Sequence, residues 1–200
     1  MVFCAVAVAC SGASPGGGGE GGTCSAVAVC DSSVVGGWEI TQSCLTASPD
    51  LSSICAGVTA SVVFSFSGTG TYNADLTYAQ TGSMGAAIHY FFPASCVGAQ
   101  TCAQVQSNIM SASSSSTMAM GFTFQSVTCA SNAGGCACDA KSTPASQDET
   151  GTYTVAGGIL TTTHGGTRDT AGYCVSGATM HQMPTTGDTQ VKGAVVFRKQ

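Results

Sequence analysis

Hydrophobic and polar residues alternate along short segments of the chain from about residue 30 onward, and Gly, Asn, Ser and Pro separate the segments. The alternation is clearest in residues 71–78, where every second position is apolar: Tyr72, Ala74, Leu76 and Tyr78. A period of two residues is typical of a strand with one buried face. The pattern therefore predicts a mostly β domain.

The predicted strands are short and bounded by turn residues. They span residues 36–44, 60–66, 70–78, 84–92, 118–129, 136–140, 151–156, 159–163, 173–176, 178–183 and 190–199. Gly157-Gly158 and the segment from Asn132 to Gly135 are expected to form hairpin turns. Because about ten strands exceed what one flat antiparallel sheet usually holds, we expect a single all-β antiparallel barrel of about 8 to 10 strands, or alternatively a β-sandwich.

One short helix is expected over residues 99–112, on the outside of the sheet. Cys102, Val105 and Ile109 are spaced to share one helical face, and Thr101 is a suitable N-cap. Nothing in the rest of the chain indicates a second domain.

The chain has 12 Cys but only 5 Lys and Arg and 10 Asp and Glu. So many thiols favour disulfides in an oxidising compartment. A metal-thiolate protein would show repeated C-x-x-C pairs, and this spacing does not occur. A net charge of −5 leaves no basic patch for a nucleic acid or an anionic membrane surface. We expect no cofactor, no metal and no nucleic-acid partner.

Setting aside Cys4 and Cys10 leaves ten Cys, which is enough for five disulfides. Spacing predicts three pairs: Cys44 with Cys55, Cys96 with Cys102, and Cys129 with Cys138 across the hairpin. The other four cysteines have three possible pairings, which the sequence leaves open: Cys24, Cys30, Cys136 and Cys174. A metal or redox site at Cys136-Ala137-Cys138 is the alternative, although His89, His164 and His181 are scattered without ligand spacing.

The first nine residues are apolar, uncharged and end in small residues, which is typical of the end of a signal peptide. Ala7-Val8-Ala9-Cys10 resembles the lipobox of bacterial lipoproteins, and the resemblance implies a lipid attached to Cys10. We therefore expect a signal-peptide remnant over 1–10, a flexible Gly-rich tether over 11–29 and a disulfide-stapled domain over 30–200. The alternative is a cleaved leader without a lipid. No apolar stretch is long enough for a spanning helix.

Gly36-Gly37-Trp38 resembles the G-x-W motif that opens lipocalin-like β-barrels. The runs Tyr153 to Leu160 and Tyr173 to Gly177 are similar to the consecutive hairpins of small bacterial lipocalin-like lipoproteins. In that family the Trp closes one end of the barrel beneath a basic side chain of the last strand. The resemblance implies that Trp38 and Arg198 form this barrel-closing pair.

Sequence motifs for catalysis are absent: there is no G-x-S-x-G elbow after a predicted strand, and no S-x-x-K, H-E-x-x-H or P-loop. His164-Gly165-Gly166 with Arg168 and Asp169 is the one local polar cluster, and a turn between strands explains it. We expect a non-enzymatic lipoprotein of the cell envelope, lipid-anchored at the outer membrane or cell surface, or alternatively secreted.

The expected partner is a small hydrophobic ligand inside the barrel or an envelope protein, and the membrane is reached through the lipid anchor alone. A structural or interaction role is the second form of this hypothesis. An envelope hydrolase and an adhesion or matrix module are the alternatives. The sequence does not identify the residues that would contact a ligand.

Overall fold

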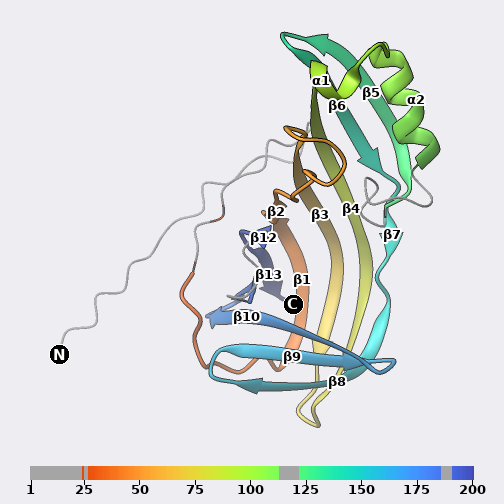
Figure 1. The fold of residues 1–200 in the computed structure, drawn as a ribbon. Helices are drawn as coiled ribbons and strands as arrows, with labels where there is room; N and C mark the ends of the chain where they lie inside the picture. The colour runs from red at the N-terminus through yellow and green to blue at the C-terminus, as the bar shows by residue number, and fades with distance from the viewer. Residues whose placement is uncertain (1–23, 25–26, 113–121, 186–190) are drawn as a thin grey trace, which may run out of the picture.

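The computed structural model describes residues 24, 27–112, 122–185 and 191–200 (Figure 1). These residues form thirteen strands and two helices. The strands are β1 (Gly36–Ser43), β2 (Thr46–Ala47), β3 (Thr59–Tyr72), β4 (Thr77–Pro93), β5 (Phe124–Asn132), β6 (Gly135–Ser142), β7 (Ala145–Ser146), β8 (Glu149–Ala156), β9 (Ile159–His164), β10 (Thr167–Ser176), β11 (Thr179–Pro184), β12 (Val191–Lys192) and β13 (Val195–Lys199). The helices are α1 (Ala94–Val97) and α2 (Cys102–Ala112).

Eight antiparallel strands close into a barrel, in the order β3, β1, β13, β11, β10, β9, β8 and β4, and pairing of β3 with β4 completes the ring. Closure leaves these strands without a free edge along the ring, which is how a barrel avoids unpaired backbone groups. The predicted all-β antiparallel barrel is confirmed. The β-sandwich alternative is wrong, because one continuous sheet curls onto itself.

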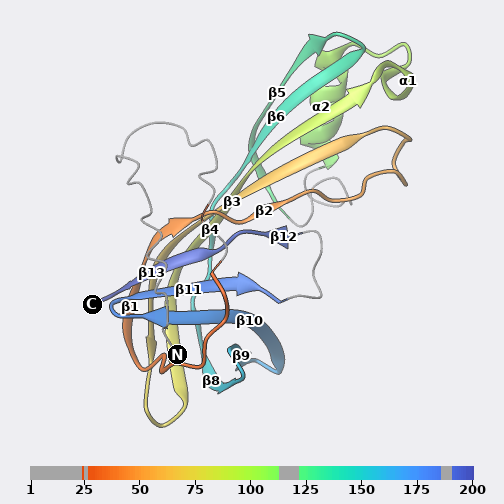
Figure 2. The same ribbon diagram turned by 90° about the vertical axis from the view of Figure 1, so that its left-hand side faces the viewer.

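β3 and β4 are much longer than the other strands and continue beyond the barrel rim (Figure 2). There β4 pairs with β6, β6 pairs with β5, and β2 pairs with the far side of β3. We call this projecting sheet, together with α1 and α2, the extension. The sequence predicts a barrel but not this extension.

A hairpin interrupts the segment that the alternation predicts as one strand over residues 70–78. Tyr72 and Tyr78 pair directly across the hairpin, and Leu76 in the turn is exposed with a φ of 67°. The predicted strands 60–66 and 70–78 are therefore wrong in their boundaries: the first extends to Tyr72 as β3, and β4 begins at Thr77. Apolar and polar residues also alternate through the turn between Tyr72 and Thr77, so the alternation does not reveal the turn.

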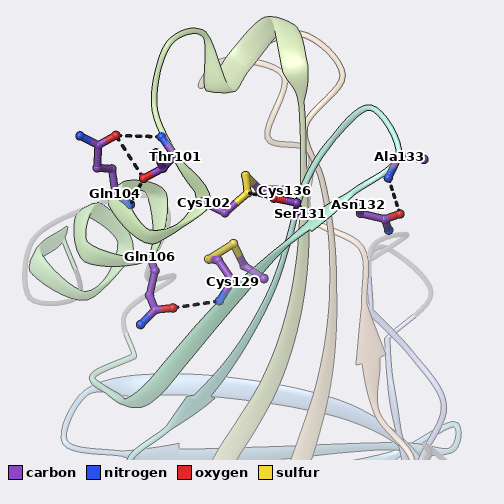
Figure 3. Close-up of a disulfide and its surroundings, with 10 residues drawn as sticks. Thr101, Cys102, Gln104, Gln106, Cys129, Ser131, Asn132, Ala133 and Cys136 are labelled. Carbon is purple, nitrogen blue, oxygen red and sulfur yellow. Dashed lines mark hydrogen bonds between the residues drawn. A yellow bond between two sulfur atoms is a disulfide. The ribbon is translucent and has the colours of Figure 1, made fainter.

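The helix predicted over 99–112 is confirmed as α2, which begins at Cys102. Its first turn is a capping box, because the Thr101 hydroxyl accepts from the Gln104 amide at 3.3 Å while the Gln104 side chain accepts from the Thr101 amide at 2.8 Å (Figure 3). Val105 and Ile109 are buried against the extension sheet. Gln106 on the same helix accepts a hydrogen bond from the backbone amide of Cys129 on β5.

Five disulfides cross-link the described part of the chain, and their pairing differs from two of the three predicted pairs. Cys129 pairs with Cys138 across the β5–β6 hairpin, as the hairpin predicts. The predicted pairs Cys44–Cys55 and Cys96–Cys102 are wrong, because the sheet places closer partners beside each cysteine. The other four disulfides are Cys24–Cys44, Cys30–Cys174, Cys55–Cys96 and Cys102–Cys136.

The predicted signal-peptide remnant, the lipid site Cys10 and most of the predicted tether lie outside the described residues. The end of the predicted tether is bound to the domain, however. Cys24 is cross-linked to Cys44, and directly after the predicted tether the Cys30 amide donates to the Tyr173 carbonyl of β10. The chain thus attaches to the domain ahead of residue 30.

Two glycines mark the boundary between the barrel and the extension. Gly68 of β3 pairs with Gly82 of β4, and a Cβ added at either would lie 2.1 or 2.2 Å from a carbonyl oxygen of the opposite strand. The strands approach this closely only because neither residue has a side chain. The described residues form two separate hydrophobic clusters, one inside the barrel and one in the extension.

Candidate functional site

The base of the barrel is filled by large side chains. Trp38 is completely buried there, and its indole Nε1 donates a 2.7 Å hydrogen bond to the carbonyl of Val34 in the segment that crosses the base. Its buried neighbours come from six other strands: Tyr72, Tyr78, Tyr153, Leu160, Tyr173 and Met180. This end of the barrel is a packed core without room for a ligand.

Lys199, not Arg198, covers Trp38. The ammonium Nζ of Lys199 lies 5.7 Å from the centroid of the indole ring. Lys199 stands directly across from Trp38 in the β1–β13 ladder, whereas Arg198 pairs with Glu39. Because neighbouring residues of a strand point to opposite faces, Arg198 lies on the outer face of the barrel and the predicted pair Trp38–Arg198 is wrong by one residue.

Above this base lies a cavity of about 370 Å³ between the barrel strands. Its volume is in the range of about 300 to 1,000 Å³ that is usual for small-molecule sites. It exists because small residues occupy inward positions at this level, namely Gly70 on β3, Gly82 on β4 and Ala171 on β10. On β3, Tyr72 occupies the inward position on one side of Gly70, and Phe66 occupies the inward position beyond Gly68 on the other side.

One wall of this cavity is apolar and is built by residues far apart in the sequence. It consists of Ile40 from β1, Phe66 from β3, Leu45, the β11 residues Met183 and Pro184, and the β13 residues Val195 and Phe197. Apolar surface of this kind gains free energy when a hydrophobic molecule displaces water from it. We call this cavity the apolar chamber.

A second cavity of about 200 Å³ adjoins the first, and most of its lining residues are polar. The two cavities share lining residues, including Tyr72, Gln80 and Gln182, so they form one continuous site. The Tyr72 hydroxyl accepts a 3.2 Å hydrogen bond from the Gln182 amide, and its ring contacts those of Tyr78 and Tyr153. We call this second cavity the polar chamber.

Two carboxylates and one imidazole meet at the polar chamber. His164 Nε2 lies 3.0 Å from Asp169 Oδ2 and 3.7 Å from Glu149 Oε2. Glu149 also accepts a hydrogen bond from the Tyr78 hydroxyl at 3.2 Å. Burial, followed by the charge and hydrogen bond of Glu149, raises the pKa of Tyr78 to about 12, so this phenol stays protonated at neutral pH.

The polar cluster noticed in the sequence is thus partly assembled and partly dispersed. His164 and Asp169 face each other across the turn made by Gly165 and Gly166, both of which have positive φ. Arg168 does not line either chamber. His89 pairs with Asp139 in the extension instead, and the half-buried His181 lies on β11 with its buried Nδ1 unbonded within the described structure.

Sequence reasoning misses Glu149, Tyr72, Gln80 and Gln182 as site residues. Each comes from a different strand, and no sequence spacing connects them. The one available signal is the period of two, which places Tyr72 and Tyr78 on the inner face but does not show which neighbours they meet.

The partners of the His164 ring in the polar chamber are carboxylates, and within the described residues its ring nitrogen does not bond to a hydroxyl or thiol. No group of three or more His, Cys, Asp or Glu in the described residues is arranged to hold a metal ion. All ten described cysteines belong to disulfides, so none offers a thiolate ligand.

Comparison of the chain with known protein families, with curated proteins and with solved structures finds no match. The class of protein is therefore defined by the fold and the site alone. It is an eight-stranded antiparallel β-barrel, consistent with a lipocalin-like fold, with a packed base, an internal two-chamber cavity and a disulfide-linked extension. None of its described helices is long and apolar enough to cross a membrane.

Proposed function

We propose that this protein is a non-enzymatic binding protein that carries a small, largely hydrophobic molecule in the barrel cavity. The observation that carries the proposal is the apolar chamber itself, a space of about 370 Å³ lined by residues of six strands. A core residue usually meets its neighbours without such gaps, because protein interiors are close-packed. An open apolar space inside a barrel is most simply explained by an occupant.

The position of the cavity supports the same proposal. The base of the barrel is packed by Trp38 and the tyrosines, so the space is confined to the part of the barrel nearest the extension. Barrels of about eight strands hold either side chains or one small ligand. Here the small residues Gly70, Gly82 and Ala171 leave the second option open.

We further propose that the protein acts outside the reducing cytosol, anchored at the cell envelope by a lipid on Cys10 or secreted. Five disulfides in one domain support an extracellular or envelope location. A tethered barrel would keep its ligand near the membrane surface. Palmitate labelling of cells that express the full chain, compared with Cys10→Ser, tests the anchor: label on the parent and not on the variant is expected.

Binding is tested with the full chain and N-phenyl-1-naphthylamine, a probe that is uncharged at neutral pH and fluoresces in apolar surroundings. We expect saturable fluorescence enhancement with a stoichiometry near one. Gly70→Leu is expected to weaken probe binding at least about tenfold, because the new side chain occupies the chamber. A Cβ at Gly70 meets no atom closer than 3.7 Å, so the strand accepts the substitution.

The matched control is Ala79→Leu, which adds the same side chain on the exposed outer face of β4, beside the lining residue Gln80. Its probe affinity should equal that of the parent chain. Ala171→Leu provides a second way of filling the cavity from β10. Absence of saturable binding would overturn the proposal. Equal probe affinities of the parent chain, Gly70→Leu and Ala171→Leu would also overturn it.

The extension supports a second candidate function, that of an interaction module. Three disulfides, Cys55–Cys96, Cys102–Cys136 and Cys129–Cys138, stabilise a part of the sheet that the barrel does not need for closure. A rigid projecting sheet is suited to contact with an envelope protein. A barrel that binds no small molecule would favour this candidate.

A further inference from the structure

We infer that the ligand carries a protonated amine at one end, and that Glu149 and Asp169 of the polar chamber bind it. This inference rests on the proposed function, since it names the chemical class of the molecule in the cavity. The ligand would be a hydrophobic amine, with its apolar part in the apolar chamber and its ammonium in the polar chamber.

The charges around the cavity carry the first step. Neither chamber is lined by a Lys or Arg in the described part of the chain, whereas Asp169 lines both chambers and Glu149 lines the polar one. A ligand with a carboxylate head, such as a fatty acid, would face two carboxylates without a fixed cation. An ammonium would instead make charge-assisted hydrogen bonds, which are about twice as strong as neutral ones.

The positions of the two carboxylates carry the second step. A single nitrogen, His164 Nε2, lies within 4 Å of Glu149 Oε2 and of Asp169 Oδ2. A nitrogen placed between the two carboxylates therefore reaches both. An ammonium has three N–H donors, and one located beside the imidazole would bond to both carboxylates and retain a third donor.

Tyr72 places a buried hydroxyl at the polar chamber. This side chain is 5% exposed and lines both chambers. Its hydroxyl accepts from Gln182 and, among the described residues, has no acceptor for its own hydrogen. An ammonium in the polar chamber would donate to the remaining lone pair of this buried hydroxyl, whereas the hydroxyl hydrogen needs an acceptor, which an ammonium lacks.

Partial exposure makes the site suitable for a charged group. The side chain of Glu149 is 24% exposed and that of Asp169 is 63% exposed, so an ammonium between them keeps part of its hydration. Full burial of a charge costs several kcal/mol, and a partly exposed site avoids part of that cost. The adjoining apolar chamber then receives the hydrophobic part of the same molecule.

The test compares three ligands with the same chain and different heads: decylamine, decanol and decanoate. Each ligand is titrated into the full chain with bound N-phenyl-1-naphthylamine at neutral pH, and displacement of the probe is measured. Each ligand is kept below its micellar concentration or solubility limit. We expect decylamine to bind at least about tenfold more tightly than decanol and decanoate to bind most weakly. The readout is the ratio of the decylamine affinity to the decanol affinity. A general change of the cavity alters both affinities alike and leaves this ratio unchanged.

Glu149→Gln and Asp169→Asn each remove one charge and keep the side-chain size. We expect the ratio to fall about threefold to tenfold in each single variant and toward one in the double variant. Asp139→Asn is the matched control, because it breaks a carboxylate–histidine pair with His89 in the extension and leaves the cavity untouched. Its ratio should equal that of the parent chain.

The outcomes separate the two proposals. If the probe binds but decylamine and decanol have equal affinities, the amine assignment is overturned and the proposed function stands. The same holds if decanoate binds more tightly than decylamine. An unchanged ratio in the double variant would also overturn the assignment. Failure of the probe and of all three decyl compounds to bind would overturn both.

Discussion

Lys199 lies over the ring of Trp38, with its Nζ 5.7 Å from the ring centroid, and the two residues face each other across the β1–β13 ladder. The pair joins the first and last strands of the described barrel at its closed end. The stem of Lys199 also lies against Gly36, where an added Cβ would be 2.9 Å from Lys199 Cε. The contact therefore combines a cation–π interaction with close packing on a residue that lacks a side chain.

Lys199→Ala is expected to lower the free energy of unfolding by about 0.5 to 1 kcal/mol, because Lys199 is exposed at this edge and its cation–π contact is partly solvated. Arg198→Ala removes the same charge from the outer face, and its effect should stay within about 0.5 kcal/mol. Urea unfolding followed by Trp38 fluorescence measures both. A larger effect at Arg198 than at Lys199 would contradict the observed register.

The fold class follows from the sequence because a period of two and glycine turns are local signals. Gly157-Gly158 joins β8 and β9, as predicted, with φ values of 56° and 74° that favour glycine. The capping residue Thr101 and the buried face of α2 are predicted for the same reason. These features depend on neighbours within a few positions, so the chain alone specifies them.

The site could not be predicted, because its residues meet only after the barrel closes. Gln80 and Glu149 are paired across β4 and β8, and Tyr72 meets Gln182 across the interior. The disulfide predictions are wrong for the same reason. Sequence spacing favours Cys44 with Cys55, whereas the folded chain brings Cys24 to Cys44. The predicted Arg198 is one position from Lys199, which covers Trp38. In a strand, a shift of one position moves a side chain to the opposite face of the sheet.

Removing the disulfide Cys30–Cys174 is expected to destabilise the protein more than removing Cys129–Cys138. The first joins residues 144 apart in sequence and the second residues 9 apart. The chain-entropy model gives about 5 kcal/mol for the longer loop taken alone and about 2.5 kcal/mol for the shorter one. Paired Cys→Ala variants, unfolded in urea without a reductant, measure the difference. Equal losses would indicate that the other disulfides already restrict the longer loop.

Gly68→Ala is expected to lower the free energy of unfolding by about 2 to 4 kcal/mol. Gly68 has a φ of 135°, and an added Cβ would lie 2.1 Å from the carbonyl oxygen of Thr81 and 2.5 Å from the Cα of Gly82. The backbone of β4 would have to move away, which would disturb the junction of barrel and extension. Gly37→Ala is the control, because its Cβ would meet only the flexible side chain of Gln200. Similar losses in both variants would contradict the close approach at Gly68.

The protein should lose stability in alkaline solution because of two buried tyrosines. Burial raises the pKa of Tyr90 to about 12, and burial together with Glu149 raises the pKa of Tyr78 to about 12. In the unfolded chain each phenol loses its proton near pH 10. Since the folded state holds these protons more tightly, their stabilising effect is complete below pH 10 and is lost as the pH rises from 10 to 12.

Each group would lower the free energy of unfolding by up to about 1.4 kcal/mol per pH unit in this window. Urea unfolding at pH 8, 10 and 11 measures the slope for the parent chain and for the double variant Tyr78→Phe, Tyr90→Phe. The variant lacks both phenols, so its free energy of unfolding should fall less steeply above pH 10. Tyr78→Phe also removes the hydrogen bond to Glu149, and that loss should appear equally at pH 8. Parallel slopes for the parent and the variant would show that these tyrosines do not hold their protons more tightly in the folded state.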